Sequence, residues 1–180
     1  METKIVLFFS GLLLLGLGGM SCKQKSQSSC CAEDHPATKK AEVMLKDYGA
    51  QPTVLDIDEF TLSNENFRTA LWTGTYLQVT LMSIAVGGEV GLEQHIDTDQ
   101  FLRIEEGEAK VVMGDSKESL TFVKDAEADF AIIVPAGKWH NIINTGNKPL
   151  KLYSIYAPVE HPHSTVHKTF KEAEEAEHHH

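Results

Sequence analysis

Two stretches of this sequence carry side chains that could hold a metal ion. A glycine-bounded stretch contains Glu93, His95 and Gln100, and a later stretch adds His140. Imidazole and carboxylate ligands suit Zn, Mn, Fe or Ni, and two histidines with one carboxylate are a familiar Fe(II) face with open positions. Gln100 adds a neutral amide oxygen. One negative ligand against a divalent cation leaves net positive charge, which favours an anionic or enolate-like ligand.

These four side chains need strands and turns to bring them together. Glu93 and His95 are two residues apart, a spacing that points both side chains to one face of a strand. Gln100 opens the next expected strand after a turn-like run, so its side chain can return beside the first two. His140 follows the turn Pro135–Gly137 and begins another strand. If that strand lies beside the others, His140 completes a four-ligand site.

The first stretch resembles the first motif of the cupin family. That motif runs Gly, five residues, His-x-His, three or four residues, Glu, six residues, Gly. Here Gly87, Glu93, His95, Gln100 and Gly107 meet this spacing throughout. Glu93 stands where the family has its first His, and Gln100 stands where it has Glu. Both substitutes keep an oxygen donor, so a metal site survives on chemical grounds while the identity of the metal stays open.

The second stretch resembles the second cupin motif, Pro-x-Gly-x-x-His-x-x-x-Asn. Pro135, Gly137, His140 and Asn144 meet it in full. The resemblance covers roughly residues 53–157. It implies an all-β fold, a cupin-like β-barrel (double-stranded β-helix or jelly roll). It also implies a divalent transition metal (Zn, Mn, Fe or Ni) held by the four residues named above, against the alternative of a metal-free pocket.

The composition is typical of one globular domain, and the net charge argues against nucleic acid as a partner. The chain has 180 residues, 42% of them hydrophobic and 23% charged, which is typical of a globular protein. Its formal net charge is -10, and no Lys/Arg cluster offsets it. The surface therefore repels phosphates, and we expect no nucleic-acid binding.

The N-terminus predicts export and a lipid anchor. Lys4 precedes a short apolar run, small residues follow, and then comes Cys22, an arrangement that resembles a bacterial lipobox. We therefore expect a signal peptide over residues 1–21, secretion across the inner membrane, and lipidation of Cys22. The product would be a membrane-anchored lipoprotein of the bacterial cell envelope. A plain cleaved signal and a retained anchor are the alternatives.

A flexible tether is expected over residues 22–42, because this span is rich in Lys, Gln, Ser and Glu. It contains Cys30 and Cys31, for which exposed thiols and metal or redox chemistry are alternative roles. The predicted cupin domain covers residues 43–170, with its barrel core at about 53–157, and a polar tail follows over residues 171–180.

The expected elements are mostly short strands with turn signals between them. We expect a helical turn over 41–48, and a turn or short helix over 57–66 with Asp58 as its N-cap. A polar helix or frayed tail is expected over 170–177. The expected strands are residues 53–56, 67–73, 76–86, 100–105, 109–113, 119–124, 130–134, 139–144 and 150–156.

Other candidate residues favour structural roles. His161, His163 and His167 lie in an irregular region, where solvated loop histidines are the preferred interpretation and an approach to the pocket mouth is the alternative. Arg103 favours an ion pair, with a substrate-anion role as the alternative. Tyr156 favours a place in the core.

The function expected from the sequence is coarse. The first hypothesis is a metal-dependent enzyme acting on a small anionic or sugar-like molecule, since the resemblance implies isomerases, dioxygenases and decarboxylases alike. The second is a non-catalytic domain that binds or senses a small molecule at the cell envelope, and a structural partner in an envelope complex is a third. The sequence does not decide whether the chain forms a homodimer. An enzyme would need an acid or base beside the metal, and the sequence names no such catalytic residue.

Overall fold

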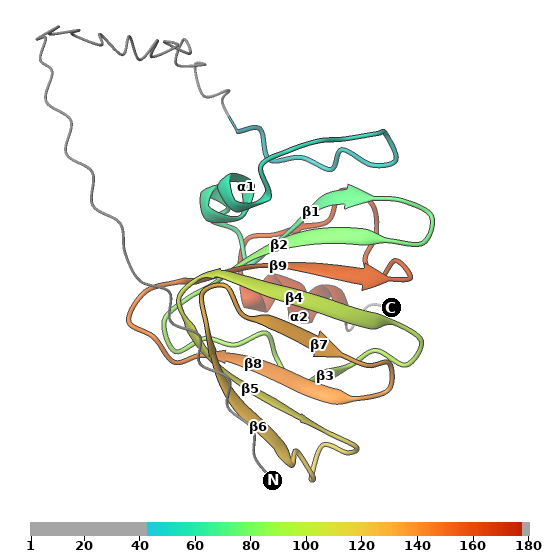
Figure 1. Ribbon diagram of the computed structural model, residues 1–180. Coiled ribbons are helices and arrows are strands. Elements are labelled where there is room, and N and C mark those ends of the chain that lie inside the picture. Colours follow the sequence, from blue (N-terminus) through green and yellow to red (C-terminus); the bar gives the residue numbers. More distant parts are fainter. Residues whose placement is uncertain (1–42, 178–180) are drawn as a thin grey trace, which may run out of the picture. The chain divides into compact units, whose positions relative to one another are not determined.

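Two antiparallel sheets face each other in the computed structural model, which describes residues 43–177 (Figure 1). One sheet has the strand order β10-β1-β2-β9-β4-β7, and the other has the order β3-β8-β5-β6. Strands that are neighbours in a sheet are often far apart in the chain, as in a jelly roll. The expected all-β, cupin-like architecture is therefore confirmed.

The strands are short, and those over residues 99–106, 108–114 and 131–134 alternate buried and more exposed residues, as expected when one face packs against a core. Their bounds, with those of the two helices, are α1 (Ile57–Ser63), β1 (Arg68–Thr73), β2 (Gln78–Ile84), β3 (Glu93–Gln94), β4 (Asp99–Glu106), β5 (Glu108–Gly114), β6 (Phe122–Glu127), β7 (Ala131–Val134), β8 (Trp139–Asn144), β9 (Leu150–Ala157), β10 (Val166–His167) and α2 (Phe170–Glu177).

The space between the sheets changes from apolar at one end to polar at the other. On β9, the buried residues pass from Leu150 and Leu152 to Ser154 and Tyr156. The neighbouring strands follow the same gradient, because Ile84 pairs with Leu150 while the polar partners of Tyr156 are Gln78 on β2 and Gln100 on β4. The apolar end supplies the hydrophobic core, and the polar end is where a site can form.

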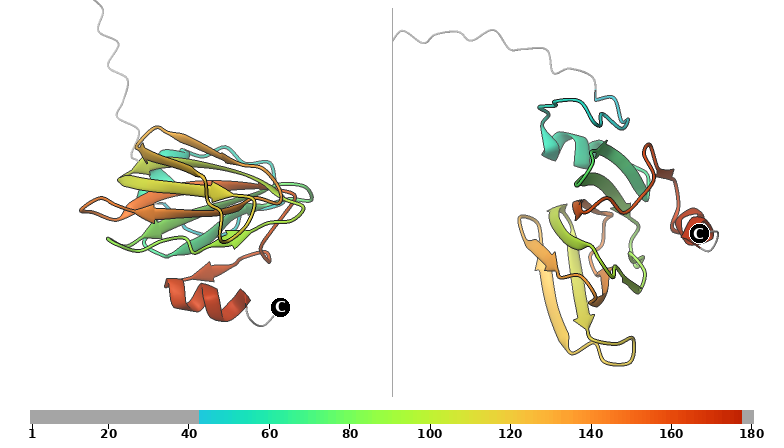
Figure 2. Two further views of the ribbon diagram at one scale, coloured as in Figure 1. Left: turned by 90° about the horizontal axis from the view of Figure 1, so that it is seen from below. Right: turned by 90° about the vertical axis from the view of Figure 1, so that its right-hand side faces the viewer.

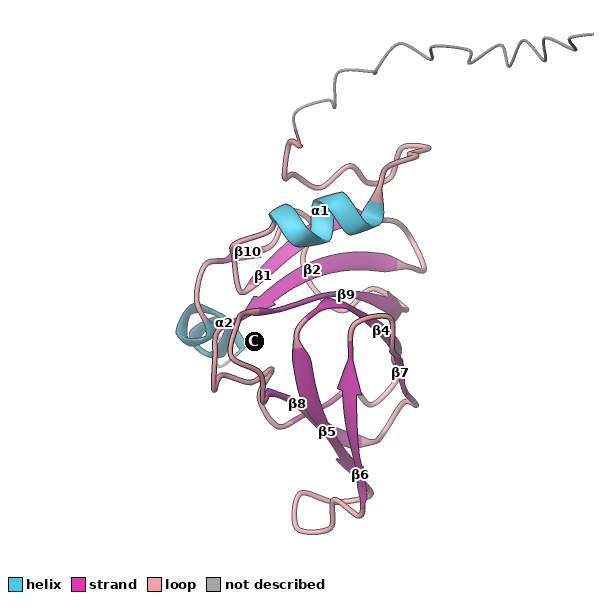
Figure 3. Ribbon diagram, turned by 60° about the vertical axis from the view of Figure 1, so that its left-hand side comes forward, coloured by secondary structure: helices cyan, strands magenta, loops and turns pink. Residues whose placement is uncertain are grey.

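Helix α1 begins two residues earlier than its expected cap implied. The N-cap is Asp56, whose side chain accepts a hydrogen bond from Glu59 N at 3.2 Å. The expectation that Asp58 caps the helix is wrong, and Asp58 lies in the first turn, where a carboxylate also suits the helix dipole. Figure 3 shows α1 against β2, and it also packs on β9 and β4.

Three other expected elements differ from the structure. No strand forms over residues 53–56, and the described part of 41–48 contains no helical turn. The strand expected over 119–124 is β6, which begins only at Phe122, because Ser116 and Ser119 close the preceding turn with an isolated bridge. Polar and apolar residues alternate on both sides of that turn, so the local pattern did not fix where the strand resumes.

The chain after β9 returns to the far edge of the larger sheet. This segment, residues 158–169, is called the C-terminal strap below. It contains β10, whose Val166 pairs with Thr69 on β1, and it leads into α2 (Figure 2). Helix α2 is polar in composition, yet Ala173 is buried and the ring of Phe170 packs edge-on against Phe67, with centroids 5.5 Å apart.

The carboxylate of Asp47 fixes the strap to the beginning of the described chain. It accepts hydrogen bonds from Gly49 N, from both the backbone and the hydroxyl of Thr73, and from Ser164 N. Within residues 43–177, no helix is both long and apolar enough to cross a lipid bilayer. The expected signal peptide, Cys22, the tether with Cys30 and Cys31, and the last three histidines lie outside the described residues.

Candidate metal centre

Glu93, His95 and His140 meet at the polar end of the barrel. Glu93 on β3 pairs directly with His140 on β8, and His95 follows β3 immediately. Each residue offers one ligand atom, and these atoms lie within 4.8 Å of one another. Glu93 Oε1 is 3.2 Å from Nε2 of His95 and 3.2 Å from Nε2 of His140. The sequence-predicted trio therefore converges on one small volume.

An oxygen atom close to Nδ1 fixes the orientation of each imidazole ring. Nδ1 of His140 lies 3.1 Å from the carbonyl oxygen of Lys138, which can only accept, so Nδ1 carries the proton and Nε2 presents its lone pair to the cluster. Nδ1 of His95 lies 3.0 Å from Glu160 Oε1, which fixes that ring in the same sense. A carbonyl or carboxylate behind each imidazole is the usual support for a metal-bound histidine.

Several buried polar atoms of the described residues have no hydrogen-bond partner, and two of them belong to expected metal ligands. One is Nε2 of His140, which is close to Glu93 Oε1 but makes no hydrogen bond with it. The other is Oε1 of Gln100, whose Nε2 donates to Ser154 Oγ at 3.0 Å. Buried polar atoms are nearly always paired, so the unpaired Nε2 of His140, which lies beside Glu93 and His95, suits a bound cation. The residues fit a divalent metal ion.

The two sequence motifs are locked to each other by backbone contacts. Gly137 N donates to the carbonyl of His95 at 2.7 Å, and Gln94 Nε2 donates to the carbonyl of Gly137 at 2.8 Å. Asp99 Oδ1 accepts from Ala136 N at 2.9 Å. Gly137 has φ +79°, a conformation that glycine adopts without steric cost. The second motif therefore sets the position of the first.

Without a metal, the cluster holds a proton between its members. Burial alone would raise the pKa of Glu93, but the two histidines, and then the Arg68 guanidinium, hold it well below its usual range. Burial opposes protonation of His95, but Glu160 and Glu93 raise its pKa to about 9. A metal ion would replace that proton, because only the neutral imidazole is a ligand.

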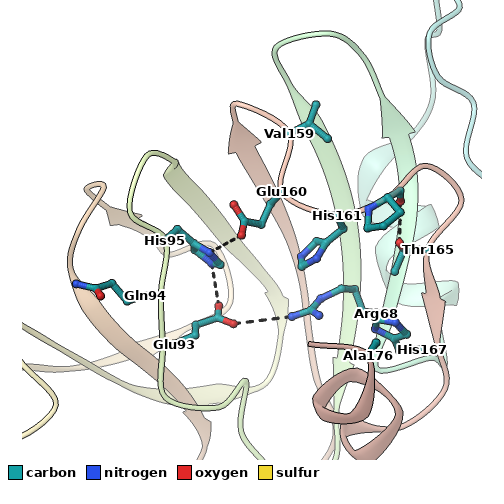
Figure 4. Close-up of a pocket in the computed structure, with 11 residues that line it drawn as sticks. Arg68, Glu93, Gln94, His95, Val159, Glu160, His161, Thr165, His167 and Ala176 are labelled. Atoms are coloured by element: carbon teal, nitrogen blue, oxygen red, sulfur yellow. Dashed lines mark hydrogen bonds and ion pairs between the residues drawn. The ribbon is translucent and has the colours of Figure 1, made fainter. Parts of the chain in front are cut away.

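A cavity of about 590 Å³ opens beside the cluster (Figure 4). Its walls combine β1, β3, the C-terminal strap and the end of α2. Its lining residues are Arg68, Glu93, Gln94, His95, Val159, Glu160, His161, Pro162, Thr165, His167 and Ala176. The volume is in the usual range for a small-molecule site.

Sequence reasoning did not name Arg68 or Glu160 as residues of this cavity. Arg68 lies on β1, and Glu160 comes from the strap. His161 and His167 also line the cavity, in agreement with the alternative that the histidines approach the pocket mouth. The preferred interpretation of His161 as a solvated loop residue is wrong, whereas His163 is exposed. A run of Glu and His directly after the last barrel strand was the only signal, and it does not say where the strap goes.

Arg103 and Tyr156 have the structural roles expected of them. Arg103 pairs with Glu105 and Asp129 and does not line the cavity. Tyr156 is fully buried, and burial raises its pKa to about 12. Its ring packs edge-on against the ring of His95, with centroids 5.5 Å apart, so it supports the site from inside the core.

Comparison with known proteins gives consistent results. Residues 80–156 match the family model described as a cupin domain. The chain is 58% identical over 135 residues to the uncharacterized protein YrkC of Bacillus subtilis, covering 75% of this chain and 73% of that one. It is 38% identical over 113 residues to the uncharacterized protein L612 of Acanthamoeba polyphaga mimivirus, covering 62% and 69%.

One solved structure is similar over nearly its whole length. It is BH2720 from Bacillus halodurans, with a TM-score of 0.72 and 55% sequence identity. The match covers 72% of this chain and 98% of that chain. At this identity and TM-score, the two chains share the same fold.

Proposed function

The chain belongs to the cupin family, and from that premise we propose that it binds one divalent transition metal, Zn, Mn, Fe or Ni. Glu93, His95 and His140 would be ligands, with the oxygen of Gln100 as a fourth donor. We further propose that the bound metal makes the protein an enzyme acting on a small anionic or sugar-like molecule. The alternative is a binding or sensing domain without catalysis.

One observation supports the metal above the others. Nε2 of both histidines and one oxygen of Glu93 converge, while each Nδ1 faces an oxygen that fixes the ring. A purely structural histidine needs no such orientation. Preorganised ligand geometry is what distinguishes a metal site from a chance cluster.

The chain's own residues would divide the work around the ion. When bound, the metal would supply a Lewis acid or an oxygen-binding centre. Glu93 would contribute the one negative ligand charge, Glu160 would orient His95, and the cavity would admit the ligand from the strap side. The site would therefore attract anions more strongly with the metal than without it.

Elemental analysis of protein purified without chelator tests the metal. We expect near-stoichiometric transition metal in the wild type and only traces in the double variant Glu93→Ala/His140→Ala. His163→Ala is the matched control, because it removes an exposed histidine outside the cluster and should keep the metal. Equal trace metal in all three proteins would refute the site.

We also propose that the mature protein is anchored at the bacterial cell envelope through a lipid on Cys22. The support is the sequence alone: a short apolar run and small residues directly before that cysteine. Cys22→Ala should move the protein from the membrane fraction to the soluble fraction, whereas Cys30→Ala should not. Retention of the Cys22 variant in the membrane fraction would contradict the anchor.

A further inference from the structure

The outer face of the larger sheet carries an apolar row that crosses five neighbouring strands. From β1 to β7, each member of this row lies directly opposite the next: Trp72, Val79, Ile155, Phe101 and Ile133. Their chain neighbours Gln78, Gln100 and Tyr156 are buried inside the barrel, so alternation along the strands sets the row on the opposite face. An antiparallel sheet that faces water on this side would carry polar residues there.

The apolar row is accessible and continuous with other apolar surface. Ile133 is 68% exposed, and the side chains of Val79, Phe101 and Ile155 are partly exposed. The ring of Tyr153, also on the outer face, lies 6.3 Å from the ring of Phe101 between centroids. At its β1 end, the row borders a hollow of about 330 Å³ whose walls are mostly apolar. A contiguous exposed apolar surface of this kind marks an interaction site, whereas single exposed apolar residues do not.

Helix α1 covers the same outer face, but only to one side of the row. The ammonium group of Lys151, near the start of β9, donates a hydrogen bond to the carbonyl of Asn64 at the C-terminal end of α1. Ile155 lies near the other end of β9. A flat partner can therefore reach the row only if it leaves α1 to one side.

A second copy of the chain meets this condition. A two-fold axis lying along the row places the row of one copy on the row of the other, and it carries each α1 to the opposite side, so the two helices do not collide. The two sheets then pack face to face about 10 Å apart, as in a β-sandwich.

The distribution of charge favours the same contact. Each copy has a formal net charge of -10, which opposes association through most of the surface. The apolar row contains no charged residue, and it includes two aromatic side chains, Trp72 and Phe101. Depletion of charge and enrichment in aromatic residues are typical of the core of a protein interface.

We propose that the apolar row is the interface of a two-fold symmetric homodimer. Gln100 and Tyr156 lie on the inner face of the same strands, so the contact between the two copies is directly behind the sheet that carries Gln100 to the candidate metal centre. The interface is independent of the proposed metal, because none of the expected ligands belongs to the row.

Sedimentation velocity of the Cys22→Ala protein at micromolar concentration tests the dimer. This background removes the proposed lipid, and a reducing buffer prevents disulfides between copies. We expect the mass of two chains. Phe101→Glu and Ile133→Glu each bring one carboxylate from each copy into an apolar contact, so each should weaken association about 100-fold or more and give the mass of one chain. Phe122→Glu is the matched control, because Phe122 is 48% exposed on the edge strand β6 of the other sheet, and this variant should stay dimeric.

Three results would overturn the proposed interface: the mass of one chain without further substitution, a dimer that persists in both Phe101→Glu and Ile133→Glu, or equal dissociation in Phe122→Glu. A single-chain mass together with binding to phospholipid vesicles that Ile133→Glu abolishes would assign the row to a lipid surface instead. Circular dichroism and thermal unfolding show whether each variant folds. Because Ile133 is largely exposed, Ile133→Glu decides the question even if Phe101→Glu fails to fold.

Discussion

Replacing Glu160 by Gln isolates the part played by the strap in the metal centre. Glu160 Oε1 lies 3.0 Å from Nδ1 of His95, and its Oε2 accepts a hydrogen bond from Thr98 at 2.9 Å. Among the expected metal ligands, the Glu160 carboxylate contacts only the imidazole of His95. Glutamine keeps the size and the polar contact with Thr98 but removes the negative charge behind the ring.

The expected magnitude follows from two opposing effects. A lost partner behind a metal-bound histidine weakens metal binding by roughly 10- to 100-fold. Glu160 also raises the pKa of His95, so the variant lowers the cost of removing the proton that competes with the metal. The side chain of Glu160 is 28% exposed, so solvent screens its charge, and we expect the lower end of the range, about tenfold.

Zinc affinity measured by competition with a chromophoric chelator at pH 7 and pH 9.5 separates the two effects. At pH 9.5, above the raised pKa of His95, the proton competes less with the metal, so most of the weakening of about tenfold should appear there. At pH 7 the difference between wild type and Glu160→Gln should be smaller. Glu118→Gln, an exposed glutamate on a distant turn, is the control and should change neither value.

Equal zinc affinity of the wild type and Glu160→Gln at pH 9.5 would refute the claim that the strap supports the metal centre. Equal weakening in Glu118→Gln would assign the effect to overall charge rather than to His95. A variant that loses zinc and also unfolds at a lower temperature without metal would indicate a structural role of the strap instead.

Three further predictions concern pH and packing. The pKa of His95 is raised from 6.5 to about 9 in the folded protein, so its contribution to the stability of the metal-free protein should be present below about pH 6.5 and lost as the pH rises through 9. Thermal unfolding of the metal-free protein at a series of pH values checks this. Zinc affinity should rise over the same pH range. Asn144→Ala removes four hydrogen bonds of a buried amide and should lower the free energy of unfolding by about 3 kcal/mol in urea titrations, and an unchanged midpoint would contradict this. Gly107→Ala should lower the free energy of unfolding by about 2 kcal/mol in the same assay, because φ is +104° and an added Cβ would lie 3.0 Å from Leu150 Cα. Gly87→Ala should lower it less, because an added Cβ there would have no atom within 4 Å.

The motif residues were predictable because their positions depend on local geometry. Residues two apart near a strand share a face, so the proximity of Glu93 and His95 follows from spacing. Gly137 and Asn144 are turn and anchor residues whose types suit their backbone or hydrogen bonds, and the motif lists them for that reason. Asp58 was expected to be the helix cap, but Asp56 fits the local pattern as well, and only the hydrogen bond that Glu59 N donates to Asp56 identifies the cap.

The rest of the cavity depends on contacts between residues far apart in the chain. Arg68 lies on a strand whose first four residues are all buried, so no alternation marks its side chain as facing the cavity. His161 is positioned by Gln78, 83 residues earlier, and the strap is fixed by β10 pairing with β1. Neither partner can be inferred from the residues around His161 itself.

The sequence by itself determined the family, the all-β barrel and the Glu93, His95 and His140 set, because motif spacing and strand periodicity encode them locally. Tertiary structure alone decided that both histidines present Nε2 to one point, that Gln100 keeps a buried unpartnered oxygen, and that the strap brings Glu160 and His161 to the cavity. The physical reason is the path of the chain after β9. Long-range strand pairing, which no local pattern specifies, carries the strap back across the open end of the barrel.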